Sequence, residues 1–311
     1  MPDVLDVPLS EWRQDEEIKI FNDAVEQFFV KELKQHVEEW REAGAVPREV
    51  WYQAAEPGLL LVSAPEEYGG AGGDFRHDAV IIEQLEKQGI AGFGIGLHNA
   101  IVAPYIIHYG SDEQKQRLLP KLASGDLVCA IAMTEPGTGS DLQNIKTTAK
   151  KDGNGYVING SKTFITNGQT ANLVLVCAKT DPTKGAKGIS IMMVETDEVD
   201  GFERGRNLKK IGQPAADMSE LFFNDVKVPA SALLGPEEGQ GFIQLMQQLP
   251  QERHIIGIQG IGMIERAIQE TVAYVKQRKA FGGTIMDFQN TQFKLAECKT
   301  EATVAKVFAD H

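Results

Sequence analysis

The chain has 311 residues, 42% of them hydrophobic, which is enough to bury a large core in two or three domains. Its 44 acidic and 31 basic side chains give a net charge of −13, and the acidic excess is concentrated in the first 125 residues. This balance, with no basic stripe, argues against nucleic acid or an anionic membrane as partner, because both are bound through clustered lysine and arginine.

The first 125 residues predict an N-terminal α-helical domain. From Ile18 to Trp40, apolar side chains recur every three or four positions, which indicates one long amphipathic helix over 16–43. Ser111 and Gln114 have the spacing of a capping box and open a later helix. This later helix is expected over residues 111–123, and other helices over 47–56, 74–87 and 92–108.

Residues 126–235 predict a middle, antiparallel β-barrel domain. Short β-type runs follow one another here, divided by glycine, asparagine, aspartate and proline. The first run, 127–133, is apolar enough for a buried strand. The other runs cover residues 147–150, 156–159, 163–166, 173–178, 189–194 and 220–228.

Residues 236–311 predict a C-terminal helical bundle. One long helix is expected through Lys279, followed by a loop at 281–283 and a second helix from about Asp287. The order of helices, then strands, then helices favours an α+β multidomain fold over a doubly wound nucleotide-binding fold, which alternates strand and helix. The glycine clusters at 92–96 and 260–262 also miss the dinucleotide fingerprint.

Other kinds of site are not indicated. The cysteines, Cys129, Cys177 and Cys298, lie far apart, so neither a disulfide framework nor a zinc site is expected. Five scattered histidines are more typical of hydrogen-bonded helix residues than of metal ligands. They are His36, His77, His98, His108 and His254. No apolar run reaches the length of a membrane span and the N-terminus lacks a signal-peptide pattern, so no membrane insertion is expected. The bacterial cytoplasm or, for a mature imported protein, the mitochondrial matrix is the expected compartment.

Two turns rich in glycine and hydroxyl side chains form the candidate ligand site. The first follows the strand predicted over 127–133, and the second ends the strand predicted over 163–166. Thr134, Ser140 and Thr166 offer hydroxyls beside backbone N–H groups, which suits the polar edge of a flat aromatic cofactor or a pyrophosphate. Taken alone, each turn is typical of an ordinary β-turn in a barrel.

Glu252 is the candidate general base. It stands next to Arg253, and because neighbouring helix residues point about 100° apart, the two are not expected to form a local ion pair. Leu249 and Ile255 make the surroundings apolar, so the carboxylate should be partly desolvated, with a raised pKa suited to a base of moderate strength. A solvated helix face is the plainer alternative. Pro250, taken in isolation, favours a helix that begins there.

These segments together resemble the flavin-binding loops and the helical base segment of the acyl-CoA dehydrogenases. The resemblance implies that both turns bind the flavin of FAD, with Thr166 near the flavin N5 atom and Ser140 also touching the substrate. Phe164 stands where many family members have tryptophan. The implied flavin-binding residues of the turns are Ile131, Met133, Thr134, Gly139, Ser140, Phe164, Ile165 and Thr166.

The resemblance also implies roles in the helical domain. Glu252 is the catalytic base in the position used by long-chain and isovaleryl-CoA dehydrogenases, and Arg253 contacts the CoA side of the substrate. Arg278 and Gln289 reach the FAD of a neighbouring subunit. A plainer alternative for Arg278 is a cation that stabilises the C-terminal end of a helix.

The implied function is FAD-dependent oxidation of a medium- or long-chain acyl-CoA to the trans-2-enoyl-CoA, with electrons passed to electron-transferring flavoprotein. A homotetramer or dimer is the implied assembly. Family members continue past His311, so the helical bundle is expected to be incomplete. A branched-chain acyl-CoA dehydrogenase and a catalytically silent fragment with a binding role are the alternatives.

Overall fold

The computed structural model describes residues 10–90 and 92–311, and the chain divides into two compact units. Unit 1 combines the chain up to Gln35 with residues 79–90 and 253–311. Unit 2 combines residues 36–78 with the segment that ends at Glu252. The three domains expected from the sequence remain a prediction.

Short helices make up one part of unit 2. Ser111 accepts a hydrogen bond from the Gln114 backbone N–H, and the Gln114 side chain accepts one from the Ser111 N–H, so the predicted capping box is confirmed. The predicted helix over 92–108 begins only at Ile95 and passes through a π-helical turn, η4 (His98–Val102). The α-helices are α3 (Val37–Ala43), α4 (Arg48–Ala55), α6 (Ile95–Leu97), α7 (Ala103–Tyr109) and α8 (Asp112–Ser124).

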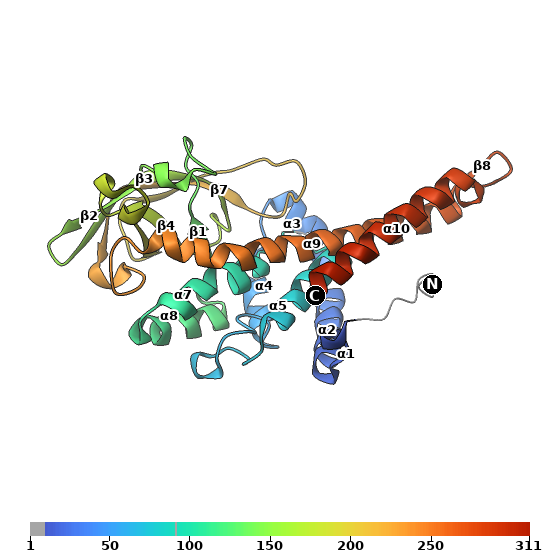
Figure 1. Cartoon of the computed structure of the whole chain (residues 1–311), viewed down its shortest axis with the longest axis horizontal. Helices are drawn as coiled ribbons and strands as arrows, with labels where there is room; N and C mark the ends of the chain where they lie inside the picture. The colour runs from blue at the N-terminus through green and yellow to red at the C-terminus, as the bar shows by residue number, and fades with distance from the viewer. Residues whose placement is uncertain (1–9, 91) are drawn as a thin grey trace. The chain divides into compact units, whose positions relative to one another are not determined.

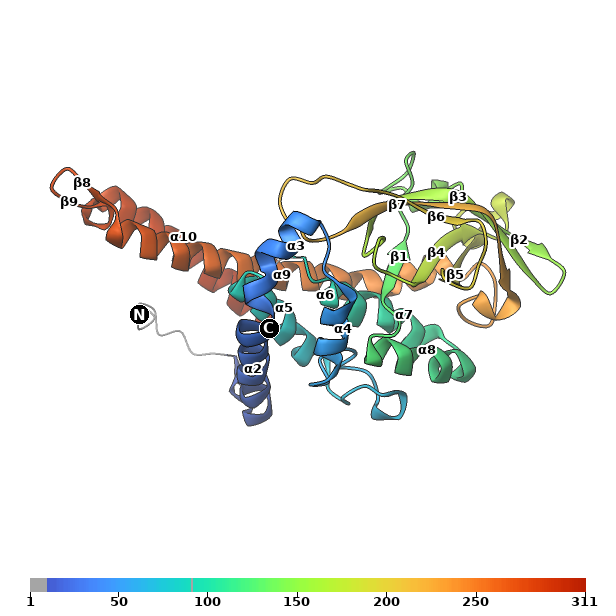
Figure 2. The same ribbon diagram turned by 180° about the vertical axis from the view of Figure 1, so that it is seen from behind.

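A seven-stranded sheet makes up the other part of unit 2. Its order is β1-β4-β2-β3-β7-β6, and β5 pairs with β4 off this path (Figure 2). The strands are β1 (Cys129–Ala132), β2 (Thr148–Asp152), β3 (Gly155–Thr166), β4 (Leu173–Lys179), β5 (Ile189–Glu195), β6 (Phe202–Asn207) and β7 (Met218–Pro229).

The expectation of a wholly antiparallel sheet is wrong. β1 runs parallel to β4, with Cys129 opposite Leu173, and β2 is parallel to β4 where Thr148 meets Lys179. Parallel neighbours need a long connection, and the chain between β1 and β4 includes two whole strands, which is ample length to return to the same end of the sheet. The sheet is therefore mixed, and it forms a half-barrel.

β3 replaces two of the predicted strands. The runs expected over 156–159 and 163–166 form one strand whose pairing with β7 shifts register twice, beyond Ile158 and beyond Lys162. Gly160 lies at the first shift, where an added Cβ would be 2.4 Å from the Thr147 Oγ1 atom, so the close approach requires glycine.

β4 lies at the centre of the core because both of its faces are buried. Leu173 and Leu175 point toward the cluster that includes α7 and α8, which lie beside the sheet in both views (Figures 1 and 2). Val174 and Val176 point the other way, toward apolar side chains of β3 and β7. This alternation has the period of two expected for a strand, and it explains why the run is continuously hydrophobic.

Unit 1 contains longer helices. The predicted helix over 16–43 is interrupted after Phe28 by a π-helical turn, η1 (Phe29–Leu33), and a 3₁₀ turn, although its apolar stripe is buried as expected at Ile18 and Val25. The elements of unit 1 are α1 (Glu11–Gln14), α2 (Glu16–Phe28), η1, most of α5 (Phe75–Gln88), the later part of α9 (Gly241–Gln277), β8 (Lys279–Ala280), β9 (Gly283–Thr284) and α10 (Gln289–Asp310).

α9 is continuous through Pro250, so a helix beginning at that proline is wrong. A proline inside a helix removes one hydrogen bond, but a helix of 37 residues retains enough packing and hydrogen bonding to continue past it. The predicted loop at 281–283 is the tip of the β8–β9 hairpin, where the Phe281 side chain is exposed.

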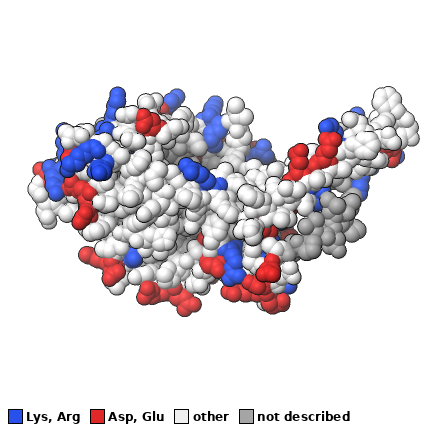
Figure 3. Space-filling model, in the orientation of Figure 1, with Lys and Arg blue, Asp and Glu red and all other residues white. Residues whose placement is uncertain are grey.

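The surface of unit 2 carries part of the acidic excess. On the face drawn in Figure 3, acidic side chains gather along the edge where Figure 1 places α8. Exposed carboxylates in this part of the chain are Glu66, Glu67, Asp112 and Glu113. Among the residues that the structure describes, no helix is both long and apolar enough to cross a membrane.

Candidate active site

The first predicted turn follows directly from β1. The backbone N–H groups of Glu135 and Thr138 each donate to the other residue's carbonyl, over 2.9 and 3.1 Å, which closes a tight loop. The residues that follow this loop are surrounded by open space. A Cβ added at Gly139 would meet no atom within 4 Å, and Ser140 is exposed. Ile131 is buried beneath the turn, and Met133 and Thr134 are half-buried.

The second predicted turn forms the end of β3. Phe164 has a left-handed backbone conformation, with φ of 59°, and the residue is 62% exposed. A bulky residue seldom adopts positive φ, and the bulge in β3 imposes it here. Ile165 is buried and Thr166 is half-buried, so the aromatic ring and the hydroxyl border the open side of the strand.

Hydrogen bonds join the two turns. The Thr163 backbone N–H donates to the Thr134 carbonyl over 2.9 Å. The buried Asn167 side chain donates through Nδ2 to the Cys129 carbonyl over 3.2 Å, which ties the end of β3 to β1. The structure therefore brings together the two sets of turn residues that the sequence identified separately.

A buried ion pair lies under the first turn. Lys162 Nζ donates to the Met133 carbonyl over 3.0 Å and to Glu135 Oε1 over 2.9 Å, and its side chain is fully buried. Glu135 also accepts from the backbone N–H groups of Lys146 and Thr147. Burial alone would raise the pKa of Glu135, but Lys162 and these donors outweigh burial and lower it. The turn is thus fixed from inside the protein.

Sequence reasoning missed this ion pair. A lysine on a strand is normally exposed, and the register shifts of β3 remove the alternation that would have predicted an inward Lys162. Glu135 lies between Thr134 and Pro136 in the first turn, but its side chain was not singled out. Glu135 could have been identified from the sequence because it lies in a segment that was already predicted to bind a ligand.

Glu252 lies on α9 with only 9% of its surface exposed. Tyr105 on α7 donates from Oη to Glu252 Oε1 over 2.7 Å. One turn earlier on α9, Gln248 is also buried, and its Nε2 atom lies 2.8 Å from His108 Nδ1. The expected desolvation of Glu252 is therefore present, although nothing in the sequence pointed to Tyr105 as its partner.

The remaining predicted site residues belong to unit 1 and have exposed side chains. Arg253 points away from the buried direction of Glu252, as the helical spacing of adjacent residues predicts. Arg278 follows the last residue of α9, and Gln289 is the first residue of α10. The β8–β9 hairpin separates these two side chains along the chain.

His98 is one of the histidines that the sequence predicts to be hydrogen-bonded helix residues instead of metal ligands. Its Nε2 lies 3.1 Å from the Leu122 carbonyl, and its Nδ1 accepts from the Cys129 backbone N–H over 3.3 Å. Burial lowers the pKa of His98 to about 4, so the ring is neutral. Within the described part of the chain, no three histidine, cysteine, aspartate or glutamate side chains gather as metal ligands would.

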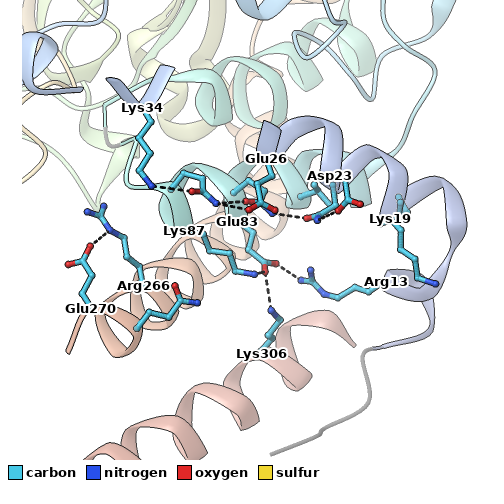
Figure 4. Close-up of a pocket in the computed structure, with 16 residues that line it drawn as sticks. Arg13, Lys19, Asp23, Glu26, Lys34, Glu83, Lys87, Arg266, Glu270 and Lys306 are labelled. Atoms are coloured by element: carbon cyan, nitrogen blue, oxygen red, sulfur yellow. Dashed lines mark hydrogen bonds and ion pairs between the residues drawn. The ribbon is translucent and has the colours of Figure 1, made fainter. Parts of the chain in front are cut away.

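A cavity of about 960 Å³ in unit 1 contains none of the predicted site residues. It is lined by charged side chains that pair with one another, as Figure 4 shows for Arg13, Glu83, Lys87 and Lys306. Because these charges compensate each other, the cavity has the character of a structural ion-pair network. The residues predicted to carry the chemistry, in the two turns and at Glu252, belong to unit 2.

Comparison with known proteins connects these features. The chain matches the models of the acyl-CoA dehydrogenase N-terminal domain over residues 15–126, the middle domain over 130–226 and the C-terminal domain over 239–311. It is 48% identical to the mitochondrial long-chain specific acyl-CoA dehydrogenase of Sus scrofa, over 94% of this chain and 68% of that protein. The chain belongs to the acyl-CoA dehydrogenase family.

Solved structures of acyl-CoA dehydrogenases have the same fold. One from Geobacillus kaustophilus is 50% identical, with a TM-score of 0.92, over 95% of this chain and 78% of that chain. Glutaryl-CoA dehydrogenase from Mycobacterium smegmatis, in complex with FADH2, is 30% identical, with a TM-score of 0.86, over 96% of this chain and 75% of that chain. The family resemblance drawn from the two turns and the Glu252 segment is confirmed.

Proposed function

We propose that this acyl-CoA dehydrogenase oxidises a long-chain acyl-CoA to the trans-2-enoyl-CoA, with FAD as the electron acceptor. The observation that carries the proposal is the buried carboxylate of Glu252, held by Tyr105 in the same unit as the two joined turns. Identity of 48% to a long-chain specific relative supports the choice of substrate.

The turns fit a flat cofactor with a polar edge. Among the described residues, none forms a hydrogen bond with the hydroxyls of Thr134 and Thr166, and Gly139 leaves open space where a side chain would stand. Both hydroxyls can therefore bind a ligand. The proposed flavin-binding residues are Ile131, Met133, Thr134, Gly139, Ser140, Phe164, Ile165 and Thr166. FAD, when bound, accepts the hydride that leaves the β-carbon of the substrate.

Glu252 is the proposed base that removes the α-proton of the acyl group. Its burial limits competition from water, and the hydrogen bond from Tyr105 favours the ionised form that can take a proton. Ser140, exposed at the first turn, is the proposed contact to the acyl-CoA at the reacting end. Arg253 is the proposed contact to the CoA moiety, since an exposed guanidinium suits phosphate groups.

Assembly and electron transfer extend the proposal. The exposed side chains of Arg278 and Gln289 are proposed to contact the FAD of a neighbouring subunit in a homotetramer or a dimer. Electron-transferring flavoprotein is the proposed acceptor of the electrons. Sedimentation of the FAD-loaded protein tests the assembly, and reduction of that acceptor tests the transfer.

Two alternatives are distinguished by simple measurements. A branched-chain enzyme would use the same base, so kcat/KM is measured across straight-chain acyl-CoAs of increasing length and isovaleryl-CoA; the proposal predicts a maximum at long straight chains. A silent binding protein would not take up flavin. Purified protein incubated with FAD and then desalted should keep the flavin absorption spectrum, and loss of that spectrum would favour the binding role.

A further inference from the structure

A buried tyrosine on α7 hydrogen-bonds the proposed catalytic base. Tyr105 Oη donates to Glu252 Oε1 over 2.7 Å, and the tyrosine side chain is completely buried. Hydrogen bonds to an ionised acceptor are short and roughly twice as strong as those between neutral groups. In a poorly solvated interior their effect on the acceptor is greater than at a surface.

The direction of this hydrogen bond is fixed by the chemistry of the pair. Burial raises the pKa of the Tyr105 phenol above its ordinary value, and the nearby carboxylate of Glu252 raises it further. The phenol therefore remains protonated and can donate. Glu252, as a carboxylate, can only accept.

Other ionisable groups act on the pair from neighbouring elements. Cys177 on β4 faces both residues, but burial raises the pKa of its thiol to about 11, so it is neutral. Tyr109 acts on Tyr105 from the same helix, and its own hydroxyl donates to Gln247 Oε1 and accepts from Gln248 Nε2. His108, also on α7, interacts with Gln248.

One buried cation acts on Cys177. Lys162 on β3 affects Cys177, and the Lys162 ammonium is paired with Glu135 at 2.9 Å. Its charge is thus compensated locally.

We propose that Tyr105 is a positioning residue for proton abstraction, which orients the Glu252 carboxylate and keeps it ionised. This inference rests on the proposed role of Glu252 as the base. A donor to the charged form of an acid favours that form, so Tyr105 sets the lower limit of the pH range in which the base can work. The phenol itself exchanges no proton with the substrate.

Tyr105→Phe tests the inference because it removes a single oxygen. We expect the pH at which the Glu252 carboxyl titrates to rise by about one unit or more, as for loss of a hydrogen bond to a charged group. Infrared difference titration of the 311-residue protein measures this directly, and the Glu252 signal is the one absent from Glu252→Gln. In FAD-loaded protein, the acidic limb of single-turnover flavin reduction should move upward by the same amount, with the rate largely retained above it.

Tyr109→Phe is the matched control. It removes the same atom one turn further along α7, from a hydroxyl that donates to Gln247 Oε1 over 2.9 Å, and it should leave the carboxyl titration unchanged. If the Glu252 carboxyl titrates at the same pH in Tyr105→Phe as in the parent, and Glu252→Gln is inactive, the proposed role of Tyr105 is overturned while Glu252 remains the base. Near-parental flavin reduction by Glu252→Gln would overturn the base assignment, and with it any role of Tyr105 in proton abstraction.

Discussion

At the scale of single residues, the buried ion pair of Lys162 and Glu135 supports a turn that is proposed to bind the cofactor. The two side chains are buried, and together they connect the first turn to β3 and to the backbone at 146–147. Removing one member of a buried pair leaves an uncompensated charge, which costs much more than the pair contributes. The turn should therefore depend strongly on both residues.

Glu135→Gln should lower the free energy of unfolding by about 3 to 5 kcal/mol, because Lys162 would remain buried without its counter-ion. The control is Glu195→Gln, which breaks the more exposed ion pair with Arg117 and should cost less than about 1 kcal/mol. Urea denaturation measures both values. Equal losses of unfolding free energy in the two variants would show that the buried ion pair matters no more to stability than the exposed one.

Thr166→Val should separate cofactor chemistry from folding. The Thr166 hydroxyl has no hydrogen bond to any described residue, so stability should change by less than about 0.5 kcal/mol. If the hydroxyl stabilises charge on the bound flavin, reduction should slow on the order of a hundredfold. Thr170→Val is the opposite control, since its hydroxyl donates to the Asp217 side chain: stability should fall while reduction is retained. Parental reduction kinetics in Thr166→Val would show that the Thr166 hydroxyl has no role in flavin reduction.

At the scale of elements, the end of β3 organises the site because its bulge and its final turn are held by specific contacts. Asn167 adopts φ of 60°, which asparagine tolerates better than most residues, and its amide joins β3 to β1. The bulge is thus the reason that Phe164 and Thr166 border the first turn.

Asn167→Ala should destabilise unit 2 by roughly 2 to 3 kcal/mol, since it leaves a buried carbonyl unpaired and places alanine at positive φ. FAD affinity should fall as well, because the two turns would no longer be held together. Asn159→Ala is the control on the same strand, where an exposed asparagine pairs with Asp225. Thermal unfolding and flavin titration measure the effects, and a parental FAD affinity in Asn167→Ala would contradict the structural role of this contact.

Elements with strong local signals were predictable from the sequence, and those set by distant pairing were not. The capping box of α8 and the apolar run of β4 were found because neighbouring residues encode them. β6 was missed because its residues, largely exposed and charged, lack an alternating pattern. The parallel pairing of β1 with β4 follows from strand neighbours that no short window of sequence contains.

The residues of the candidate site also divide into those with a local sequence signal and those determined by distant contacts. The two turns and Glu252 were identified by composition and by family resemblance, and the structure joins the turns through Thr163 and Asn167. Tyr105 was not identified because it stands 147 positions from Glu252 and looks like one aromatic residue in an apolar helix. Such partners are determined by tertiary packing, which the sequence does not display locally.

At the scale of the whole molecule, charge balance couples stability to pH. In unit 1, Glu83 pairs with Arg13 of α1, Lys87 of α5 and Lys306 of α10 (Figure 4). Burial alone would raise the pKa of Glu83, but the three cations lower it to about 2. A carboxylate with a depressed pKa stabilises the folded state above its unfolded pKa of 4.5, and this contribution is lost as the pH falls toward 2.

The Glu83 contribution should amount to on the order of 3 kcal/mol, and it should disappear on acidification. The difference in free energy of unfolding between the parent and Glu83→Gln should narrow as the pH falls from about 4.5 toward 2. Glu270→Gln, which removes an exposed partner of Arg266, is the control and should show little change. A difference that stays constant with pH would mean that Glu83 is not held ionised by its neighbours.

Single-turnover reduction of FAD-loaded protein by a long-chain acyl-CoA tests the proposal that Glu252 removes the α-proton of the substrate. Glu252→Gln keeps the size of the side chain but removes the carboxylate, so acyl-CoA should bind about as well as in the parent. Flavin reduction should fall by on the order of a hundred- to ten-thousand-fold. Bleaching of the flavin absorbance at a near-parental rate in Glu252→Gln would show that another residue is the base.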